Sequence, residues 1–139
     1  MASTDILLVE DNPADIYLVQ KAVAELGTEL RLWLVTNGRD ALTFLRQEGP
    51  YQQAPAPALI ILDINLPHMH GTQTLAELRQ FPAYQATPVV MFTSARRDLE
   101  EQHCRHLGAN DYVEKPSDLS DFFAAVHGIV RQWLPPGST

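Results

Sequence analysis

Five short runs of apolar residues, each separated from the next by a longer amphipathic segment, restrict the folds open to this chain more than any other feature. The runs cover residues 6–9, 30–35, 59–62, 89–92 and 112–113. Several consist of consecutive Val, Ile and Leu without alternating polar residues, which is typical of parallel strands buried on both faces of a sheet. We therefore predict a β-strand at each of these positions.

The segments between the runs carry helix signals. Asn12 followed by Pro13 combines an N-cap residue with proline at the first helical position, and Gly27 follows Leu26, where the apolar periodicity ends. Further helices are expected over residues 39–48, 71–80, 98–107 and from about 118 to 133. The last helix carries one apolar face, formed by Leu119, Phe122, Val126, Ile129 and Trp133.

Alternation of five strands with five helices predicts an α/β fold with a parallel sheet and helices on both faces. The expected architecture is a doubly wound (βα)5 flavodoxin-like sheet with strand order 2-1-3-4-5. The Pro-rich segment 49–57 is expected to be a surface loop. At 139 residues the chain fits a single domain, which we place at 1–139 with its core at about 5–134 and no second domain.

Composition excludes several classes of function. Ten Lys and Arg against seventeen Asp and Glu give a net charge of −7, and because an acidic surface repels the phosphate backbone, we expect no nucleic-acid partner. One cysteine excludes an internal disulfide and a cysteine-rich zinc module, and suits a reducing cytoplasm. The amino-terminal residues lack a secretory-signal pattern, and the longest apolar stretch is too short for a membrane span. We expect a cytoplasmic protein without membrane association.

Polar residues follow four of the predicted strands at their carboxyl ends. They are Glu10 and Asp11, Asp63, Thr93 and Ser94, and Lys115 and Pro116. In a doubly wound sheet these ends meet at one edge, so the side chains are expected to share a pocket. Three neighbouring carboxylates repel one another unless a cation neutralises them. Oxygen donors without clustered His or Cys favour a hard ion, and Mg2+ in particular, because it leaves room for phosphate oxygens.

Asp63 interrupts the apolar run between Ala58 and Leu66, where an unpaired charge is costly unless it serves a purpose. A lysine and a hydroxyl suit the oxygens of a phosphoryl group, and a carboxylate can be the nucleophile that becomes an aspartyl-phosphate. The pattern therefore indicates phosphoryl transfer onto Asp63. The alternatives are that Asp63 caps a helix, or that these are unrelated polar strand ends.

Four blocks of the sequence also resemble the signature blocks of response-regulator receiver domains, in order and at normal spacing. They are ILLVEDNPAD, LIILDINLPHMHG, VVMFTSA and GANDYVEKP. The resemblance covers roughly residues 5–133 and implies a two-component signalling switch. In such a switch Asp63 is the phosphoacceptor for a histidine kinase, and the chain catalyses only its own phosphorylation and dephosphorylation.

The resemblance also implies roles for the other site residues. Asp11 and Asp63 would bind Mg2+ directly, Glu10 would bind it through water, and the backbone carbonyl of Asn65 would complete the protein's ligands. Two further residues hold the phosphoryl group in the family, and these positions are Thr93 and Lys115 here. Tyr112 takes the place of the switch aromatic, and the Lys115–Pro116 bond is expected to be cis. Ser117 departs from the family, which often has an aromatic residue there, and leaves the packing of the last helix open.

Without an output domain, the signal would pass to a protein partner or to a second copy of the chain. The resemblance places that surface on the helix at 98–107, the strand at 112–113 and the helix that begins near 118. Since Phe123, Ile129, Val130 and Trp133 cannot all point one way, some of them are expected to form an exposed patch for a homodimer. Asn12-Pro-Ala-Asp15, the long loop before the third strand and the segment 118–122 resemble the small regulators that serve bacterial phytochrome kinases.

Other readings of the same residues remain open. A phosphatase of the haloacid-dehalogenase type also uses an aspartyl nucleophile and Mg2+, but it needs a second Asp where this chain has Asn65. A flavin-binding electron carrier lacks support, because no Gly-, Ser- or Thr-rich loop follows the first strand. A third alternative is a receiver-like scaffold that is never phosphorylated. His103, Cys104 and His106 allow a transition-metal site, although solvent-facing histidines fit their loose spacing better.

Overall fold

The predicted strands form one parallel five-stranded sheet in the order β2-β1-β3-β4-β5 in the computed structural model, which describes residues 4–134. The strands are β1 (Thr4–Val9), β2 (Leu30–Val35), β3 (Leu59–Leu62), β4 (Val89–Thr93) and β5 (Asp111–Glu114). The helices are α1 (Pro13–Ala24), α2 (Gly38–Leu45), α3 (Gly71–Leu78), α4 (Arg97–His106) and α5 (Leu119–Trp133). The predicted fold and strand order are confirmed. Residues 1–3 and 135–139 of the expected domain lie outside the described range.

Two short 3-10 helices lie between these elements, η1 (Gly49–Tyr51) and η2 (Pro82–Tyr84). The first lies in the Pro-rich segment 49–57, which is predicted as a surface loop. Helix α2 ends at Leu45, earlier than predicted, and Gln47 just beyond it adopts a φ of 58°. A left-handed residue cannot continue a right-handed helix, so the chain turns there.

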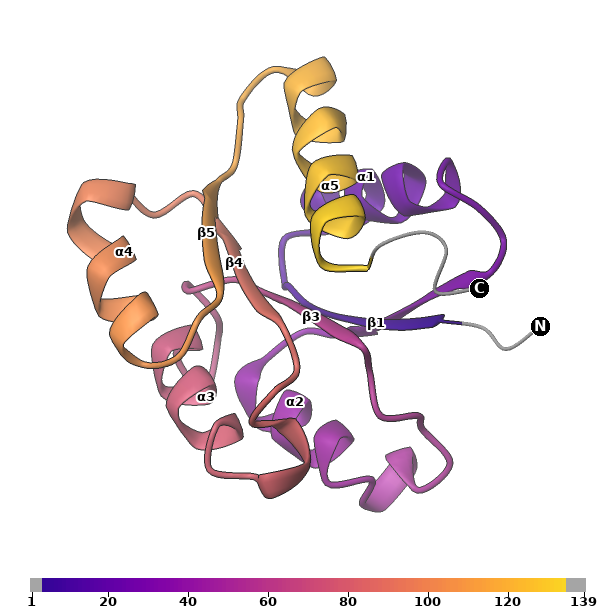
Figure 1. Ribbon diagram of the computed structural model, residues 1–139, viewed down its shortest axis with the longest axis vertical. Helices are drawn as coiled ribbons and strands as arrows, with labels where there is room; N and C mark the ends of the chain where they lie inside the picture. The colour runs from indigo at the N-terminus through magenta and orange to yellow at the C-terminus, as the bar shows by residue number, and fades with distance from the viewer. Residues whose placement is uncertain (1–3, 135–139) are drawn as a thin grey trace.

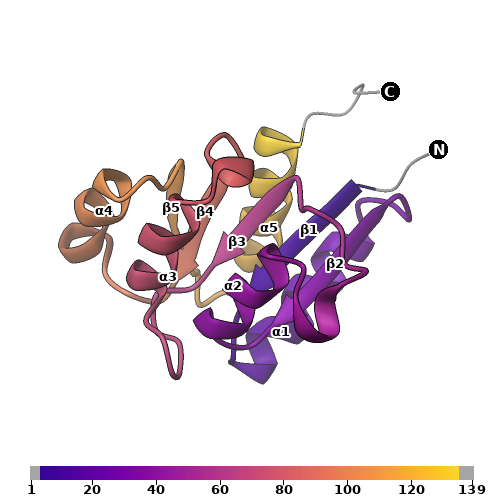
Figure 2. The same ribbon diagram turned by 90° about the horizontal axis from the view of Figure 1, so that it is seen from below.

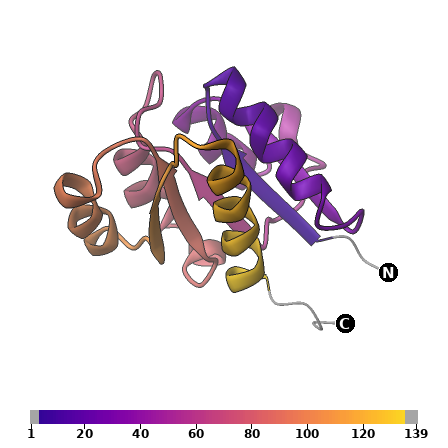
Figure 3. The ribbon, with the colours of Figure 1, turned by 90° about the horizontal axis from the view of Figure 1, so that it is seen from above.

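Helices cover both faces of the sheet (Figures 1–3). Helices α1 and α5 lie together on one face, α2 and α3 on the other, and α4 lies beside β5 at one edge of the sheet. Successive residues of a strand point to opposite faces. In β1, Leu7 packs with residues of α2 and α3, while Ile6 packs with residues of α1 and α5.

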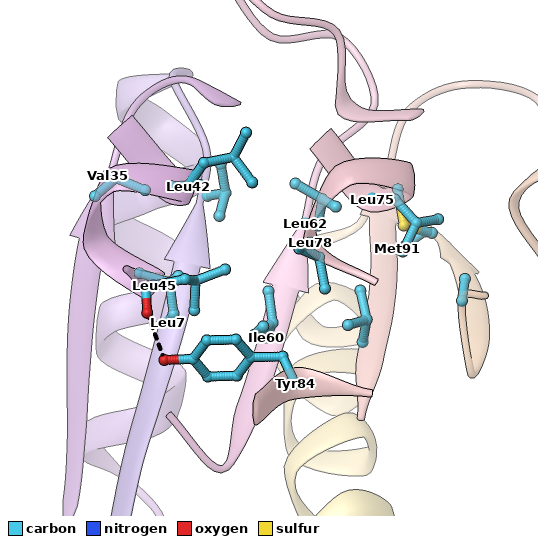
Figure 4. Packing of buried hydrophobic residues seen from close by; sticks show 14 of the residues in the cluster. Leu7, Val35, Leu42, Leu45, Ile60, Leu62, Leu75, Leu78, Tyr84 and Met91 are labelled. Carbon is cyan, nitrogen blue, oxygen red and sulfur yellow. Dashed lines mark hydrogen bonds between the residues drawn. The ribbon is translucent and has the colours of Figure 1, made fainter. Parts of the chain in front are cut away.

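Two apolar clusters therefore sandwich the sheet. The cluster beneath α2 and α3 is drawn in Figure 4, where the hydroxyl of buried Tyr84 donates a hydrogen bond of 2.7 Å to the carbonyl of Leu45. This bond satisfies the phenol inside the apolar layer, where an unpaired hydroxyl would be costly. It also ties η2 to the end of α2.

Side-chain caps set where the helices begin. The side chain of Asn12 accepts a hydrogen bond from the backbone N–H of Asp15, with Pro13 at the first helical position. Asp118 caps α5 by accepting a hydrogen bond from the N–H of Asp121. Helix starts therefore lie immediately after β1 and β5, beside the carboxyl edge of the sheet.

The prediction of an exposed apolar patch on the last helix is wrong. Ile129 and Val130 are buried in the core, and Phe123 and Trp133 pack half-buried against the same cluster. The contact between α5 and α1 covers this side of the helix in addition to the contact with the sheet, so none of the four is exposed. Within residues 4–134, no helix combines the length and the apolar character that crossing a membrane requires.

Candidate functional site

The sheet register brings the predicted site residues together. Val9 of β1 lies opposite Leu62 of β3, and the N–H of Asp63 donates to the carbonyl of Val9 at 3.1 Å. The residues that follow these strands, Glu10 and Asp63, therefore emerge side by side. At the other side of the site, the N–H of Lys115 donates to the carbonyl of Thr93 at 2.8 Å and aligns the end of β5 with that of β4.

Three carboxylates meet at this edge. One oxygen from each of Glu10, Asp11 and Asp63 lies within 4.8 Å of the other two. Glu10 and Asp63 are buried, with 1% and 7% of their surface exposed, while Asp11 faces solvent. A buried pair of acids with a third at the opening offers hard oxygen donors on one side and access for a ligand on the other. The residues fit a divalent cation of the Mg2+ type.

Asn65 lies two residues beyond Asp63 at an exposed position. The role of its backbone carbonyl as a metal ligand stays a prediction. The histidines and the cysteine of α4 do not gather: His103 and His106 are exposed, whereas Cys104 is fully buried in the core. Among the residues described, the acidic triad at the sheet edge is the cluster whose donors lie close enough for a metal ion.

Glu10 is the most buried acid of the site. Its Oε2 accepts hydrogen bonds from the N–H groups of Asp11 and Asn12, at 3.2 and 3.1 Å, and its Oε1 accepts one from Lys115 at 2.6 Å. Burial and the neighbouring charge of Asp63 nevertheless raise the pKa of Glu10 to about 7, against the lowering effect of Lys115. Without a metal, burial and repulsion between the carboxylates disfavour the charged form of Glu10.

Lys115 joins the acids. Its Nζ lies 2.6 Å from Glu10, 2.7 Å from Asp15 and 3.1 Å from Asp63, and the side chain is 5% exposed. Burial alone would lower the pKa of this lysine, but the hydrogen bonds to Asp15 and Glu10 and the charge of Asp63 outweigh it and raise the pKa. Lys115 therefore stays a cation at the centre of the site.

Sequence reasoning did not assign Asp15 to the site. Asp15 lies on the first turn of α1, where the Asn12 cap holds its backbone, and its carboxylate reaches Lys115 from there. The available signal was the helix start directly after Asp11, because the first turn of a helix that follows β1 stays at the carboxyl edge of the sheet.

Asp63 is held in one orientation. Its Oδ1 accepts a hydrogen bond of 2.7 Å from the N–H of Ile64, and its Oδ2 accepts one from Lys115. The loop that follows folds back, with the N–H of Gly71 donating to the carbonyl of Ile64 at 2.7 Å. A Cβ at position 71 would overlap the carbonyl of Asp63 and approach the Cα of Ile64 to 2.7 Å, so glycine is required there.

Thr93 and Tyr112 are both fully buried and are linked through Ala95. The hydroxyl of Thr93 accepts a hydrogen bond from the N–H of Ala95 at 3.2 Å, and the hydroxyl of Tyr112 donates to the carbonyl of Ala95 at 2.8 Å. Arg97 donates to the carbonyl of Tyr112 at 2.6 Å and lies 5.7 Å from its ring centroid. A contiguous set of contacts thus runs from the site to the start of α4.

The cis bond expected between Lys115 and Pro116 is wrong, because the part of the chain that the structure describes contains no cis peptide bond. The trans isomer is favoured by about 0.5–1 kcal/mol even before proline. From the trans backbone the Lys115 side chain already reaches Glu10, Asp15 and Asp63, so these contacts do not require the other isomer.

Comparison with known proteins identifies the family. The model of the response regulator receiver domain matches residues 6–127. The chain belongs to the response regulator receiver domain family. The predicted family is thereby confirmed, and the chain is a signalling protein of the receiver type, which separates it from the haloacid-dehalogenase phosphatases and the flavin carriers.

Several receiver relatives match nearly the whole chain. The response regulator Rcp1 of Synechocystis is 39% identical over 129 residues, which are 93% of this chain and 88% of Rcp1. The phosphorylated cyanobacterial phytochrome response regulator RcpA is 40% identical with a TM-score of 0.92, over 96% of both chains. The Mn2+-bound form of Rcp1 is 38% identical with a TM-score of 0.88, also over 96% of both chains.

Proposed function

We propose that this receiver is a phosphorylation switch in which Asp63 accepts a phosphoryl group from a histidine kinase, with Mg2+ as cofactor. The observation that carries the proposal is the setting of Asp63: a buried carboxylate fixed by Lys115 beside Glu10 and Asp11. The phosphorylated relative RcpA supports the proposed phosphorylation, and the Mn2+-bound relative Rcp1 supports the proposed divalent metal. Because histidine kinases use ATP, which is present in the cytoplasm, we propose that the protein acts there.

In this proposal Asp11, Asp63 and the Asn65 carbonyl would bind Mg2+ directly, and Glu10 would bind it through water. When bound, Mg2+ neutralises acid charge and the charge of the transferred group. A carboxylate oxygen of Asp63 attacks the phosphorus of the kinase phosphohistidine, the P–N bond breaks, and the histidine leaves with the bonding electron pair. Lys115 pairs with one phosphoryl oxygen and the hydroxyl of Thr93 donates to another.

The same proposal gives the signal a route to the surface. A phosphoryl group adds negative charge and acceptor oxygens beside Thr93. When Thr93 turns its hydroxyl toward this group, its hydrogen bond with Ala95 is lost, and Ala95 also anchors Tyr112. The switch therefore changes the surface formed by α4, β5 and α5. We propose that this surface passes the signal on by binding a partner protein or a second copy of the chain.

A phytochrome-type histidine kinase is the proposed partner, because RcpA is described as a phytochrome response regulator. Phosphotransfer assays with several purified histidine kinases test this point. Transfer from a phytochrome-type kinase should be faster than from kinases of other sensor classes, and equal rates would contradict the partnership.

Chemical phosphorylation tests the central proposal. Wild-type protein and Asp63→Asn are incubated with a small phosphodonor, with and without Mg2+, and phosphate that is stable in acid but labile in base is measured. Wild type should be labelled only with Mg2+, and Asp63→Asn should not be labelled. Absence of label in wild type would refute the switch and favour the scaffold that is never phosphorylated.

The metal assignment has its own variants. Glu10→Gln combined with Asp11→Asn should lower the labelling rate at least tenfold, since a lost ligand set typically costs this much or more. A matched control is Glu29→Gln combined with Glu48→Gln, which replaces two exposed acids outside the site. The control should be labelled like wild type. Normal labelling of the site variant would show that these acids do not bind the metal.

A further inference from the structure

Asp15 is an acid of the site that the phosphorylation chemistry does not use. Its Oδ2 lies 2.7 Å from the Nζ of Lys115, closer than the 3.1 Å between Lys115 and Asp63. Its side chain is 21% exposed, and it does not belong to the triad of clustered metal donors. The Asn12 cap fixes its backbone, so the contact with Lys115 is built into the start of α1.

All donors of Lys115 are occupied. An ammonium group has three N–H donors. Glu10, Asp15 and Asp63 accept from Nζ at 2.6, 2.7 and 3.1 Å. A phosphoryl oxygen on Asp63 needs a charge-assisted hydrogen bond from the same group. Any such bond has to displace an acceptor already present or share its donor.

Charge acts in the same direction. Three carboxylates, those of Glu10, Asp15 and Asp63, contact the single charge of Lys115, and the carboxylate of Asp11 lies within 4.8 Å of those of Glu10 and Asp63. Phosphorylation adds further negative charge to this group, and repulsion between charges a few ångströms apart in a half-buried site is substantial. Asp15 contributes to the repulsion without supplying one of the clustered metal donors.

We propose that Asp15 is a positioning residue that competes with the phosphoryl group for Lys115 and so limits how tightly the phosphorylated state is held. The inference rests on the proposed function, because it assumes that Lys115 binds the phosphoryl group. In the unphosphorylated protein the same contact keeps Lys115 directed toward α1 and partly neutralised.

Asp15→Asn tests the inference, because an amide keeps the size and one acceptor oxygen but removes the charge. The affinity for beryllofluoride, a phosphoryl mimic, is measured by calorimetry at saturating Mg2+. Asp15→Asn should bind about tenfold more tightly than wild type, because Lys115 is released from the Asp15 carboxylate and one nearby like charge is removed. Asp15→Glu, which restores the carboxylate, should return to within about threefold of wild type. Glu48→Gln, an equal change of charge at an exposed position outside the site, should leave the affinity unchanged.

Transmission through Lys115 is measured in a Lys115→Ala background, where only the direct repulsion by Asp15 remains and Asp15→Asn should tighten binding by about threefold or less. Without metal, Asp15→Asn should also lower the unfolding temperature, because the ion pair with Lys115 is lost. Unchanged or weaker beryllofluoride binding by Asp15→Asn would overturn the inference, as would equal tightening without Lys115. Failure of wild type itself to bind beryllofluoride would instead overturn the proposed function.

Discussion

The surroundings of Glu10 disfavour its charged form. Burial and the charge of Asp63 raise its pKa from 4.5 to about 7, while the unfolded chain keeps the ordinary value. Between these two values the folded protein holds a proton that the unfolded chain has released. A raised pKa contributes stability that is present below pH 4.5 and lost as the pH rises through 7. The metal-free protein should therefore lose stability over this range.

The expected loss from Glu10 between pH 4.5 and about 7 amounts to about 3 kcal/mol of unfolding free energy. Urea unfolding at several pH values in the presence of a chelator measures it. In Glu10→Gln the contribution should be absent, so the difference between the two proteins isolates this residue. Parallel pH profiles for wild type and Glu10→Gln would contradict the assignment.

Two glycines give a second prediction at the residue scale. Gly71→Ala places a methyl group against the carbonyl of Asp63 and should destabilise the fold by about 1–3 kcal/mol, as overpacking does. Gly128→Ala on the exposed side of α5 meets nothing within 4 Å and should stabilise by about 0.5–1 kcal/mol. Urea unfolding of both variants checks the opposite signs. A neutral Gly71→Ala would mean that the loop after Asp63 can move away at no cost.

At the scale of elements, Arg79 fastens α3 to two later segments. Its guanidinium donates to the carbonyls of Tyr84, Thr87 and Gly108 and to the side chain of Asn110, at 2.6–3.0 Å. The Asn110 side chain accepts in turn from the N–H of Val89 at the start of β4. One side chain therefore satisfies backbone groups that lead into β4 and β5.

Arg79→Lys should lower the unfolding free energy by about 2–4 kcal/mol. Lysine keeps the charge but cannot present the planar fork of donors, so several half-buried carbonyls lose their partner. Arg131→Lys on the exposed side of α5 is the control and should change stability by less than about 0.5 kcal/mol. Equal effects of the two variants would show that the Arg79 contacts contribute nothing specific.

Prediction from sequence succeeded for elements with a strong pattern and for residues that depend on strand ends. Strands β2 and β3 occupy the predicted residues, and the ends of β1, β3, β4 and β5 bring Glu10, Asp63, Thr93 and Lys115 to one edge. The strands and the residues at their ends could be predicted because each apolar run is a local sequence pattern and parallel topology brings the strand ends together.

The features missed depend on contacts between distant segments. The helix start after Asp11 places Asp15 near the carboxyl edge of the sheet, but the sequence does not indicate that a lysine 100 positions later will reach it. The apolar residues of α5 number more than one face can hold, but only the packing against α1 shows that Ile129 and Val130 are covered. The η1 and η2 helices are too short to show an apolar periodicity from which they could be predicted.

At the scale of the whole molecule, the sheet has two unlike edges. The β2 edge lies far from β4 and β5 in the strand order, and Leu34 is 37% exposed on it. At the other edge α4 lies beside β5 (Figure 1), and Leu99 in the first turn of α4 is 68% exposed. Contacts through Ala95 and Tyr112 connect Thr93, at the acidic site, to this second edge.

The edge at α4 and β5 also carries a ladder of exposed ion pairs. Arg97 and Arg105 both contact Glu101, at 2.9 and 2.8 Å, and Arg105 contacts Asp111 of β5 at 3.1 Å. Exposed pairs of this kind contribute little to the stability of a single chain. Arg97, Glu101, Arg105 and Asp111 could therefore pair with the same residues of a second copy at a small cost in free energy. Because positive and negative side chains alternate along this edge, two copies related by a two-fold axis could place opposite charges together.

Beryllofluoride with Mg2+ should therefore raise the mass of the 15.5 kDa chain toward that of a dimer in light scattering. Leu99→Glu should weaken this association at least tenfold, because it would place a charge where the proposed contact buries the exposed side chain of Leu99, while beryllofluoride affinity stays within about twofold. Leu34→Glu, the same change on the opposite edge, should dimerise like wild type. A monomer at every concentration, or equal dimerisation by Leu99→Glu and wild type, would remove this edge as the contact between copies.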